Sequence, residues 1–456
     1  MAADPVIPAA DFRQARRAVR KSFWQVYWPL ALSWFFMGWE GQVAVGLIGL
    51  MPENEVLQAG VLVVWGLAML VESPVIDLLS TATTLGTDRV RYAQISKFAG
   101  ILMLWVTVVH SLVVFTPAYH VVAVEWMGNK PEVADAARDG LFWMPLWAAC
   151  VGWRRYRQGI MIRAESTRPI SIGTLIRVVT TALVGGGLYL SKALSGMSVV
   201  GAAFAAAVFA EALYIHFASA KVIHALPDDR GEPPMGLAKL FRFHLPLTAS
   251  TLLMLTTPFL MARALNQTAD PIIAMAAWQV AGTVAWLFET ATFALPEAVI
   301  ARYRPGDERT IAMFCLAVGG ALSGGMLATH VTGLDRWIFE TAYHSKPEVA
   351  NQASIAFLWT SPLPLLVSAQ SFFRGMLTAH HITSARMAAI LVGLAAMGLV
   401  LQAGLKTSLP GVVVGALGVL SYSGVELAIL AGTWARSARK PPLGPDLSQA
   451  QTEPGV

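Results

Sequence analysis

Residues 28–33 read Trp-Pro-Leu-Ala-Leu-Ser, and residues 245–250 read Leu-Pro-Leu-Thr-Ala-Ser. Each stretch lies inside an apolar segment, and the shared Pro-Leu-x-x-Ser pattern recurs at an offset of 217 residues. The same offset carries Glu72 onto Glu289, each in the apolar segment that follows. Pro145 falls on position 362, also a proline, at this offset. Together these matches predict that one helical unit is present twice along the chain.

The composition indicates that lipid is the solvent for much of this protein. Of its 456 residues, 55% are hydrophobic and only 13% are charged. Ordinary soluble domains carry about 25% charged residues, so the polar surface here could not cover a globule of this size. A membrane-spanning helix needs about 20 mostly apolar residues. The backbone finds no hydrogen-bond partners in lipid, so the apolar segments are expected to be helices.

Twelve segments meet this length requirement. They are residues 23–50, 57–86, 96–117, 139–162, 171–190, 198–222, 240–264, 271–299, 310–329, 352–378, 385–404 and 409–434. A polar, proline-rich linker divides them into six and six. Six is an even number, so both copies share one orientation, and the repeat is parallel about a pseudo-two-fold axis along the membrane normal. The predicted fold class is therefore an all-α integral membrane protein with about 12 transmembrane helices in two six-helix lobes.

This division gives five regions. We expect a basic cytoplasmic interfacial helix, a first six-helix lobe, a cytoplasmic linker, a second six-helix lobe and a disordered cytoplasmic tail, at residues 1–22, 23–222, 223–239, 240–434 and 435–456. In the first of these, apolar residues recur every three to four positions between arginines, which is typical of a helix lying on the inner leaflet.

Lysine and arginine predict the orientation. Of the 33 such residues, 26 fall in the two termini and in the loops on the same side as the termini. Short loops rich in these residues stay in the cytoplasm, so both termini are predicted to be cytoplasmic and the chain to lie in the inner membrane. The densest basic cluster follows the fourth span and comprises Arg154, Arg155, Arg157, Arg163 and Arg168. It has two interpretations: a topology signal that contacts anionic lipid, or an additional attraction for anionic substrates.

Sequence motifs exclude several classes of function. The chain has no Walker A loop, no GxGxxG, no GxSxG and no HExxH. We therefore expect no enzyme activity, no cofactor, no metal site and no nucleic-acid partner. Transport would be driven by an ion gradient, with proton and sodium both open as the coupling ion, or by the gradient of the substrate.

Ionisable and polar residues at membrane depth are the candidate site. A charge there costs several kcal/mol unless it faces protein or water. The candidates for a substrate or ion cavity are Glu40, Glu72, Asp77, Arg177, Glu211, Glu289 and Gln370. Arg177 and Glu211 have an alternative interpretation as a buried ion pair within the first lobe. Glu72 and Glu289 are either carboxyls that exchange protons as the cavity opens, or neutral structural groups.

The layout resembles the MOP flippase superfamily, which includes the MATE multidrug exporters and the polysaccharide and lipid-precursor flippases. Four stretches look closer to its progressive ankylosis branch. They are Tyr-Trp-Pro-Leu at 27–30 with Glu-Gly-Gln at 40–42, Pro-Val-Ile-Asp at 74–77, Phe-His-Leu-Pro-Leu at 243–247 and Ser-Pro-Leu-Pro at 361–364. The resemblance implies a V-shaped pair of lobes that work by alternating access. The branch implies export of anions such as pyrophosphate, nucleoside triphosphate or citrate.

The predicted function is a secondary active exporter or flippase, acting as a monomer in contact with membrane lipids. Its predicted cargo is a small organic or phosphorylated anion that resembles pyrophosphate, a nucleotide or citrate. The alternatives are ion-coupled efflux of cationic drugs, flipping of a lipid-linked saccharide, and a membrane scaffold that transports nothing. The structure can separate these, because a flippase needs a lateral opening between helices. An exporter of soluble ligands instead needs a cavity with closed walls.

Overall fold

The computed structural model describes residues 9–164, 166–228, 235–304, 306–380, 382 and 384–437. Within these residues the protein consists of helices joined by short loops. The first half contains α1 (Ala9–Gly49), α2 (Asn54–Ile76), α3 (Leu78–Leu85), α4 (Arg89–Phe115), α5 (Ala118–His120), the π-helix η1 (Val121–Trp126), α6 (Pro131–Phe142), α7 (Trp147–Arg163), α8 (Arg168–Ser191) and α9 (Met197–His224).

The second half repeats this order. It contains α10 (Leu237–Leu255), α11 (Thr257–Leu265), α12 (Pro271–Thr290), the 3-10 helix η2 (Ala291–Ala294), α13 (Leu295–Arg302), α14 (Glu308–Val331), α15 (Leu334–Trp337), the π-helix η3 (Ile338–Ala342), α16 (Pro347–Thr360), α17 (Leu363–Ala379), α18 (Ser384–Gly404) and α19 (Gly411–Ser437). The two π-helices begin 217 residues apart, at the offset that relates the sequence repeats.

The predicted fold class is confirmed. Within the described residues, ten helical segments are long and apolar enough to cross a membrane. The other two predicted spans correspond to α1 and to the α6–α7 pair. From Ala9, the predicted interfacial segment continues into the first span as one helix without a break. Residues 229–234 of the predicted linker and residues 438–456 of the predicted tail lie outside the described residues.

Prolines coincide with the places where spans are broken into two helices. Pro74 lies just before the break between α2 and α3, and Pro258 lies at the start of α11. Pro145 and Pro362 lie at the α6–α7 and α16–α17 breaks, again in corresponding places in the two halves. Proline lacks an amide hydrogen and clashes with the preceding turn, which favours breaks at these positions. Pro246, however, lies inside the unbroken helix α10.

Glycines allow neighbouring helices of each half to pack closely. A Cβ on Gly159 would collide with the backbone carbonyl of Leu79, and a Cβ on Gly375 would lie 2.6 Å from the Cβ of Val299. These two glycines are 216 residues apart, within one residue of the repeat offset. They mark the contact of α7 with α3 and the matching contact of α17 with α13.

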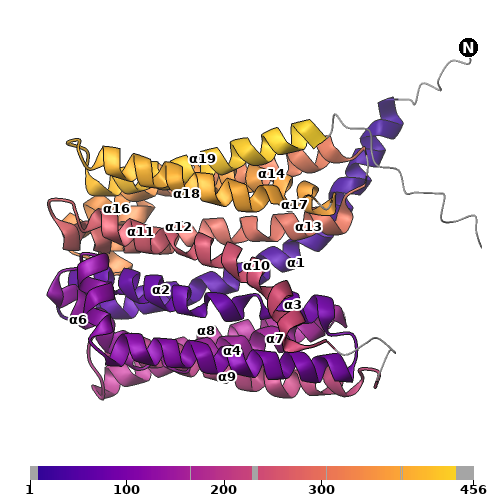
Figure 1. Cartoon of the computed structure of the whole chain (residues 1–456). Helices are drawn as coiled ribbons and strands as arrows, with labels where there is room; N and C mark the ends of the chain where they lie inside the picture. The colour runs from indigo at the N-terminus through magenta and orange to yellow at the C-terminus, as the bar shows by residue number, and fades with distance from the viewer. Residues whose placement is uncertain are drawn as a thin grey trace, which may run out of the picture.

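The helices form two layers (Figure 1). Elements α1 to α9, from indigo to magenta, make the first lobe, and α10 to α19, up to yellow, make the second. Two helices, α1 and α10, run between the lobes, and we call them the crossing helices. The ring of Phe23 in α1 packs 4.7 Å from Phe314 of the second lobe, while Glu40 in the same helix contacts the first lobe. Helix α1 therefore links both lobes.

Candidate functional site

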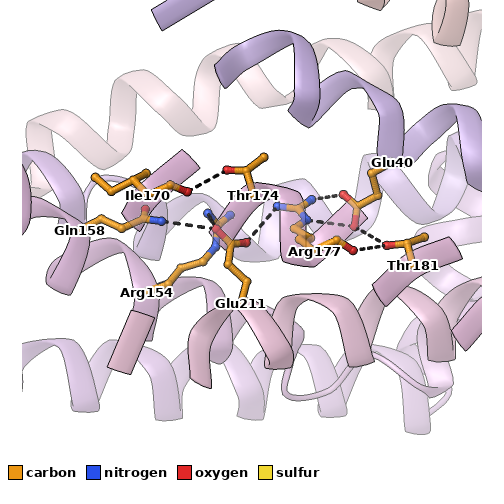
Figure 2. Close-up of polar contacts among 8 residues, drawn as sticks. All are labelled: Glu40, Arg154, Gln158, Ile170, Thr174, Arg177, Thr181 and Glu211. Carbon is orange, nitrogen blue, oxygen red and sulfur yellow. Dashed lines mark hydrogen bonds and ion pairs between the residues drawn. The ribbon is translucent and has the colours of Figure 1, made fainter. Parts of the chain in front are cut away.

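A chain of buried charges runs through the first lobe (Figure 2). The Arg177 guanidinium of α8 faces Glu40 of α1: Nε donates to Oε1 at 2.9 Å, and Nη2 donates to Oε2. Thr181, one turn along α8, donates its hydroxyl to the same carboxylate at 3.3 Å. Glu40 is only 2% exposed. A carboxylate at this depth is stable only with such a partner, so the pair fixes α1 against α8.

This chain of buried charges continues to Glu211 of α9, which is fully buried. Arg154 Nη1 donates to Glu211 Oε1 at 3.1 Å, and Gln158 Nε2 lies 3.4 Å from the same oxygen. The predicted pairing of Arg177 with Glu211 is present as a longer contact of 3.9 Å. Arg177 thus lies between two carboxylates, and its shorter contacts are with Glu40.

The sequence placed Arg154 and Arg157 in a basic cluster at the membrane surface, and this interpretation needs correction. Arg154 is 2% exposed and Arg157 is 8% exposed, and both lie within α7. Arg157 donates to Ser219 Oγ at 3.0 Å and stacks on Trp153, 4.7 Å from the ring centroid. Counting charges by loop did not reveal this burial, because the residues at the end of the fourth span were counted with the loop that follows it.

Glu72 and Arg155 lie beside this chain of charges without joining it. Glu72 of α2 is 4% exposed, and its Oε2 is buried without a hydrogen-bond partner. Arg155 forms no hydrogen bond or ion pair with any described residue, and its Nε is also buried without a partner. The two groups interact electrostatically with each other.

Among the charged groups that act most strongly on Glu72 and Arg155, three arginines and three carboxylates balance only when Glu72 is ionised. The arginines are Arg154, Arg155 and Arg177, and the carboxylates are Glu40, Glu72 and Glu211. If Glu72 takes up a proton, one positive charge is left over. Arg155 is the arginine that forms no hydrogen bond or ion pair with a described residue, so its charge is the one left without a counter-ion. The site can therefore attract an anion or a proton, depending on the state of one carboxyl.

The second lobe has its own buried ion pair. Arg374 Nε donates to Glu426 Oε1 at 2.9 Å, and Arg374 Nη2 lies 3.4 Å from the side-chain oxygen of Gln370. Gln370 also donates to the Ser423 carbonyl at 2.7 Å and is 1% exposed. Of the candidate residues, Gln370 thus supports α17 against α19. The sequence analysis missed Arg374, whose position one turn after Gln370 in an apolar segment was the available signal.

Glu289 lies apart from every charge cluster. It lines a cavity of about 190 Å³ in the second lobe, with Trp278 and Trp286 on the same face of α12 and Thr360 opposite. Its carboxylate has no hydrogen bond or ion pair with any described residue. Although Glu289 matches Glu72 in the repeat, only Glu72 has arginines nearby.

Each crossing helix contacts the other elements beside the space between the lobes at particular residues. On α1, a Cβ on Gly38 would lie 2.9 Å from Leu287 of α12, and Gln42 donates to the Thr283 carbonyl at 2.6 Å. On α10, the His244 ring bonds to the first lobe through Thr81 Oγ1 at 2.9 Å and the Pro74 carbonyl at 2.7 Å. Direct contacts along both seams leave no gap between helices at these points.

The lobes also meet at the end of the bundle where α1 joins α2, which the charge distribution predicts to face outward. Gln58 Nε2 donates to Ser345 Oγ at 3.1 Å, and Lys346 Nζ lies 2.5 Å from Glu55 Oε1. The hydrogen bond to Glu55, together with its charge, raises the pKa of Lys346 above its usual value. Residues 343–346 therefore hold the second lobe against the start of α2.

A matching contact lies across the pseudo-two-fold axis. Asn266, after α11, donates to Asn129 Oδ1 at 2.7 Å and to the Met127 carbonyl at 3.1 Å. Asn129 corresponds to Lys346 at the 217-residue offset. This end of the bundle thus has two equivalent contacts between the lobes, each of which joins the segment after a π-helix to the opposite lobe.

The sequence matches no protein-family model and no curated protein. The fold is similar to the inward-facing conformation of a multidrug resistance MATE family transporter of the MOP superfamily, with a TM-score of 0.68 at 14% identity over 88% of this chain and 95% of that chain. It is similar to the lipid II flippase MurJ in its inward closed conformation, with a TM-score of 0.67 at 11% identity over 89% and 87%. It is also similar to a MOP superfamily transporter from Pyrococcus furiosus, with a TM-score of 0.60 at 13% identity over 93% and 98%.

These similarities confirm the predicted resemblance to the MOP superfamily at the level of the fold. The chain has the architecture of MATE transporters and of MurJ. The narrower resemblance to the progressive ankylosis branch is not tested by these structures and stays a prediction.

Proposed function

We propose that this protein is a secondary active exporter that moves a small organic or phosphorylated anion out of the cytoplasm by alternating access. The MATE-like fold supports transport by two lobes, and the transporters it resembles support a role other than catalysis. The basic-residue distribution supports an inner-membrane location with both termini in the cytoplasm. The complete pair of lobes in one chain supports a monomer surrounded by lipid.

The partnerless Arg155 carries the proposal of an anionic cargo. A guanidinium offers several donors in a planar arrangement that suits carboxylate and phosphate oxygens. At Arg155 these donors have no partner among the described residues, although Nε is buried. A half-buried arginine left without a partner is costly unless a ligand supplies one. The Pyrococcus furiosus transporter is described as having a binding pocket of reverse polarity that suggests a different function.

The contacts made by the crossing helices support a water-soluble cargo. MurJ is a lipid II flippase, and a lipid-linked cargo must enter from the side. Here α1 contacts α12 through Gly38 and Gln42, and α10 contacts the first lobe through His244. A pyrophosphate-, nucleotide- or citrate-like anion needs no lateral passage.

Transport by purified protein in proteoliposomes tests the proposal. We expect uptake of labelled pyrophosphate, ATP or citrate, and we expect Arg155→Gln to reduce it about 10- to 100-fold, the effect of losing a charged hydrogen bond of about 1.5–3 kcal/mol. The control is Arg168→Gln, which removes an exposed arginine at the start of α8. It should change the rate little. Anion uptake that is equal in both variants would remove Arg155 from the site.

The cavity at Glu289 favours a second candidate, efflux of organic cations. Two indole rings beside an unpaired carboxylate attract organic cations through cation–π and charge interactions. The same proteoliposomes loaded with tetraphenylphosphonium distinguish the two functions. Transport of this cation without transport of any anion would overturn the anion proposal and support multidrug efflux.

Because the two lobes meet at the predicted outer end, we expect a cross-link between them there to block transport reversibly. We expect the pair Asn129→Cys and Asn266→Cys, in a chain with Cys150→Ala and Cys315→Ala, to react with a short bis-methanethiosulfonate reagent. The cross-link should stop transport because the lobes could no longer separate at this end, and a reductant should restore it. Each single-cysteine variant is the control. Full transport by cross-linked protein would show that this contact does not need to open.

A further inference from the structure

The part of the crossing helix α1 that approaches the predicted outer end contacts both lobes. Toward the first lobe, Glu40 accepts a hydrogen bond from Arg177 Nε of α8 at 2.9 Å. Toward the second lobe, Gln42, only two residues further along, donates from Nε2 to the Thr283 carbonyl of α12 at 2.6 Å. Separation of the lobes at this end therefore has to break one of these two sets of contacts.

Gln42 also links α1 to the segment of the second lobe that meets the first lobe at this end. Its Oε1 accepts a hydrogen bond from the hydroxyl of Tyr343, the residue that directly follows the π-helix η3. Tyr343 is 5% exposed, and a Cβ on Gly49 of α1 would collide with its backbone carbonyl. The amide of Gln42 thus uses its donor on α12 and its acceptor on Tyr343, so one side chain ties α1 to two elements of the second lobe.

The contacts of α1 with the first lobe are the harder set to break. Glu40 and Arg177 are both buried, and separating them would leave two charges without their partners. The bonds of Gln42 join neutral groups, which exchange protein partners for water at little net cost. At its inner end α1 is held by the second lobe, where the buried ring of Phe23 packs 4.7 Å from Phe314. If the outer part of α1 follows the first lobe, the helix therefore pivots about this inner contact.

The sequence repeat shows that this link belongs to α1 alone. At the 217-residue offset, Gln42 corresponds to Phe259 and Tyr343 corresponds to Trp126. Neither aromatic residue carries an amide or a hydroxyl, so the bond between Gln42 and Tyr343 has no counterpart at the equivalent place. One side chain of one crossing helix therefore makes a link that its repeat partner cannot make.

We propose that Gln42 is the latch of the outer end: opening releases its bonds to Thr283 and Tyr343, while α1 stays with the first lobe through Glu40. This inference rests on the alternating access of the proposed function. Both bonds exist only when the outer end is closed, so they favour the closed form and reduce the population from which cargo is released outward.

The variant Tyr343→Phe removes the hydroxyl and keeps the ring. The parent is the full-length chain with Cys150→Ala, Cys315→Ala and Asn129→Cys, purified in nanodiscs. Asn129 is 3% exposed where the lobes meet, so a cysteine there reacts when the outer end opens. We expect a water-soluble maleimide to label it about fivefold faster in Tyr343→Phe than in the parent, the effect of removing one neutral hydrogen bond from the closed form.

Two further variants test whether the bond to Gln42 is the cause. Tyr189→Phe is the matched control, because the Tyr189 hydroxyl donates to the Leu50 carbonyl at 3.2 Å and joins α8 to the end of α1 within the first lobe. It should leave the labelling rate unchanged. Gln42→Met removes both bonds at a similar length and should speed labelling about 25-fold, the product of two such effects. Adding Tyr343→Phe to Gln42→Met should change nothing more, because the two substitutions remove the same bond.

Equal labelling rates in Tyr343→Phe and Tyr189→Phe would overturn the latch. So would faster labelling of the native Cys315, which is fully buried in α14, because it would show general loosening of the protein. Uptake of pyrophosphate by the wild type in proteoliposomes is measured separately. Uptake together with equal labelling rates overturns the latch and leaves the proposed function standing. Faster labelling of Tyr343→Phe without any anion uptake keeps the latch and overturns the proposed anionic cargo.

Discussion

Replacing Arg177 with methionine is expected to destabilise the protein by about 3–5 kcal/mol, the usual cost of removing one partner of a buried ion pair. The variant would leave Glu40 without its two short contacts and would remove the second arginine from Glu211. Glu40 is too deeply buried for water to replace the guanidinium. The measurement is the melting temperature of the purified protein in detergent, together with the yield of monodisperse protein.

The double variant Glu40→Met with Arg177→Met separates structure from transport. Both charges are removed together, so we expect most of the lost stability to return. Transport should then also return if the pair serves only to fix α1 against α8. A stable double variant that transports nothing would assign the pair to the cargo path. The surface control is Arg336→Met, which breaks the exposed pair with Glu340 and should leave the melting temperature nearly unchanged.

Features that depend on local chemistry could be predicted from the sequence. The repeat is one example, because the offset of 217 that relates Glu72 to Glu289 also relates the two π-helices. The helix breaks are a partial example, since Pro74, Pro145 and Pro362 lie at breaks while Pro246 lies inside the unbroken helix α10. These features carry their cause within a few residues, so no knowledge of the tertiary contacts was required.

The partner of each buried charge could not be predicted in this way. Arg177 and Glu211 lie at similar depth in adjacent helices, so the sequence suggested that they form an ion pair. The shorter contact is with Glu40, which is 137 residues away and reaches Arg177 only because α1 packs on α8.

Glu72 and Glu289 occupy equivalent positions in the repeat, but the residues around them differ. Both are acidic residues at matching places in the repeat. Arg154, Arg155 and Arg177 act on Glu72, whereas among the described residues no charged group acts on Glu289. A duplicated unit keeps its backbone while its side chains diverge, so a role inferred for one copy does not transfer to the other.

The difference between the two carboxyls leads to a prediction about coupling, which we propose to be carried by protons. Ionised Glu72 balances Arg155, whereas protonated Glu72 leaves the arginine free for an anion. Cargo binding should therefore be favoured by proton uptake, and in the wild type the transport rate should change by up to about tenfold per pH unit over the range where one group titrates. Glu72→Gln fixes the protonated form in nearly the same shape. We expect it to bind cargo at every pH and to lose the pH dependence.

Uptake of labelled pyrophosphate into inside-out vesicles, measured against external pH, tests this coupling. The matched control is Glu289→Gln, the same change at the equivalent place in the repeat, where no arginine depends on the carboxyl for its charge balance. It should keep the wild-type pH profile, because the surplus charge that draws the anion arises only beside Arg155. If the profiles of the wild type and both variants coincide, Glu72 is structural, and proton uptake does not govern cargo binding. If Glu289→Gln alone flattens the profile, the proton is carried in the second lobe, and the balance of charges around Arg155 does not govern coupling.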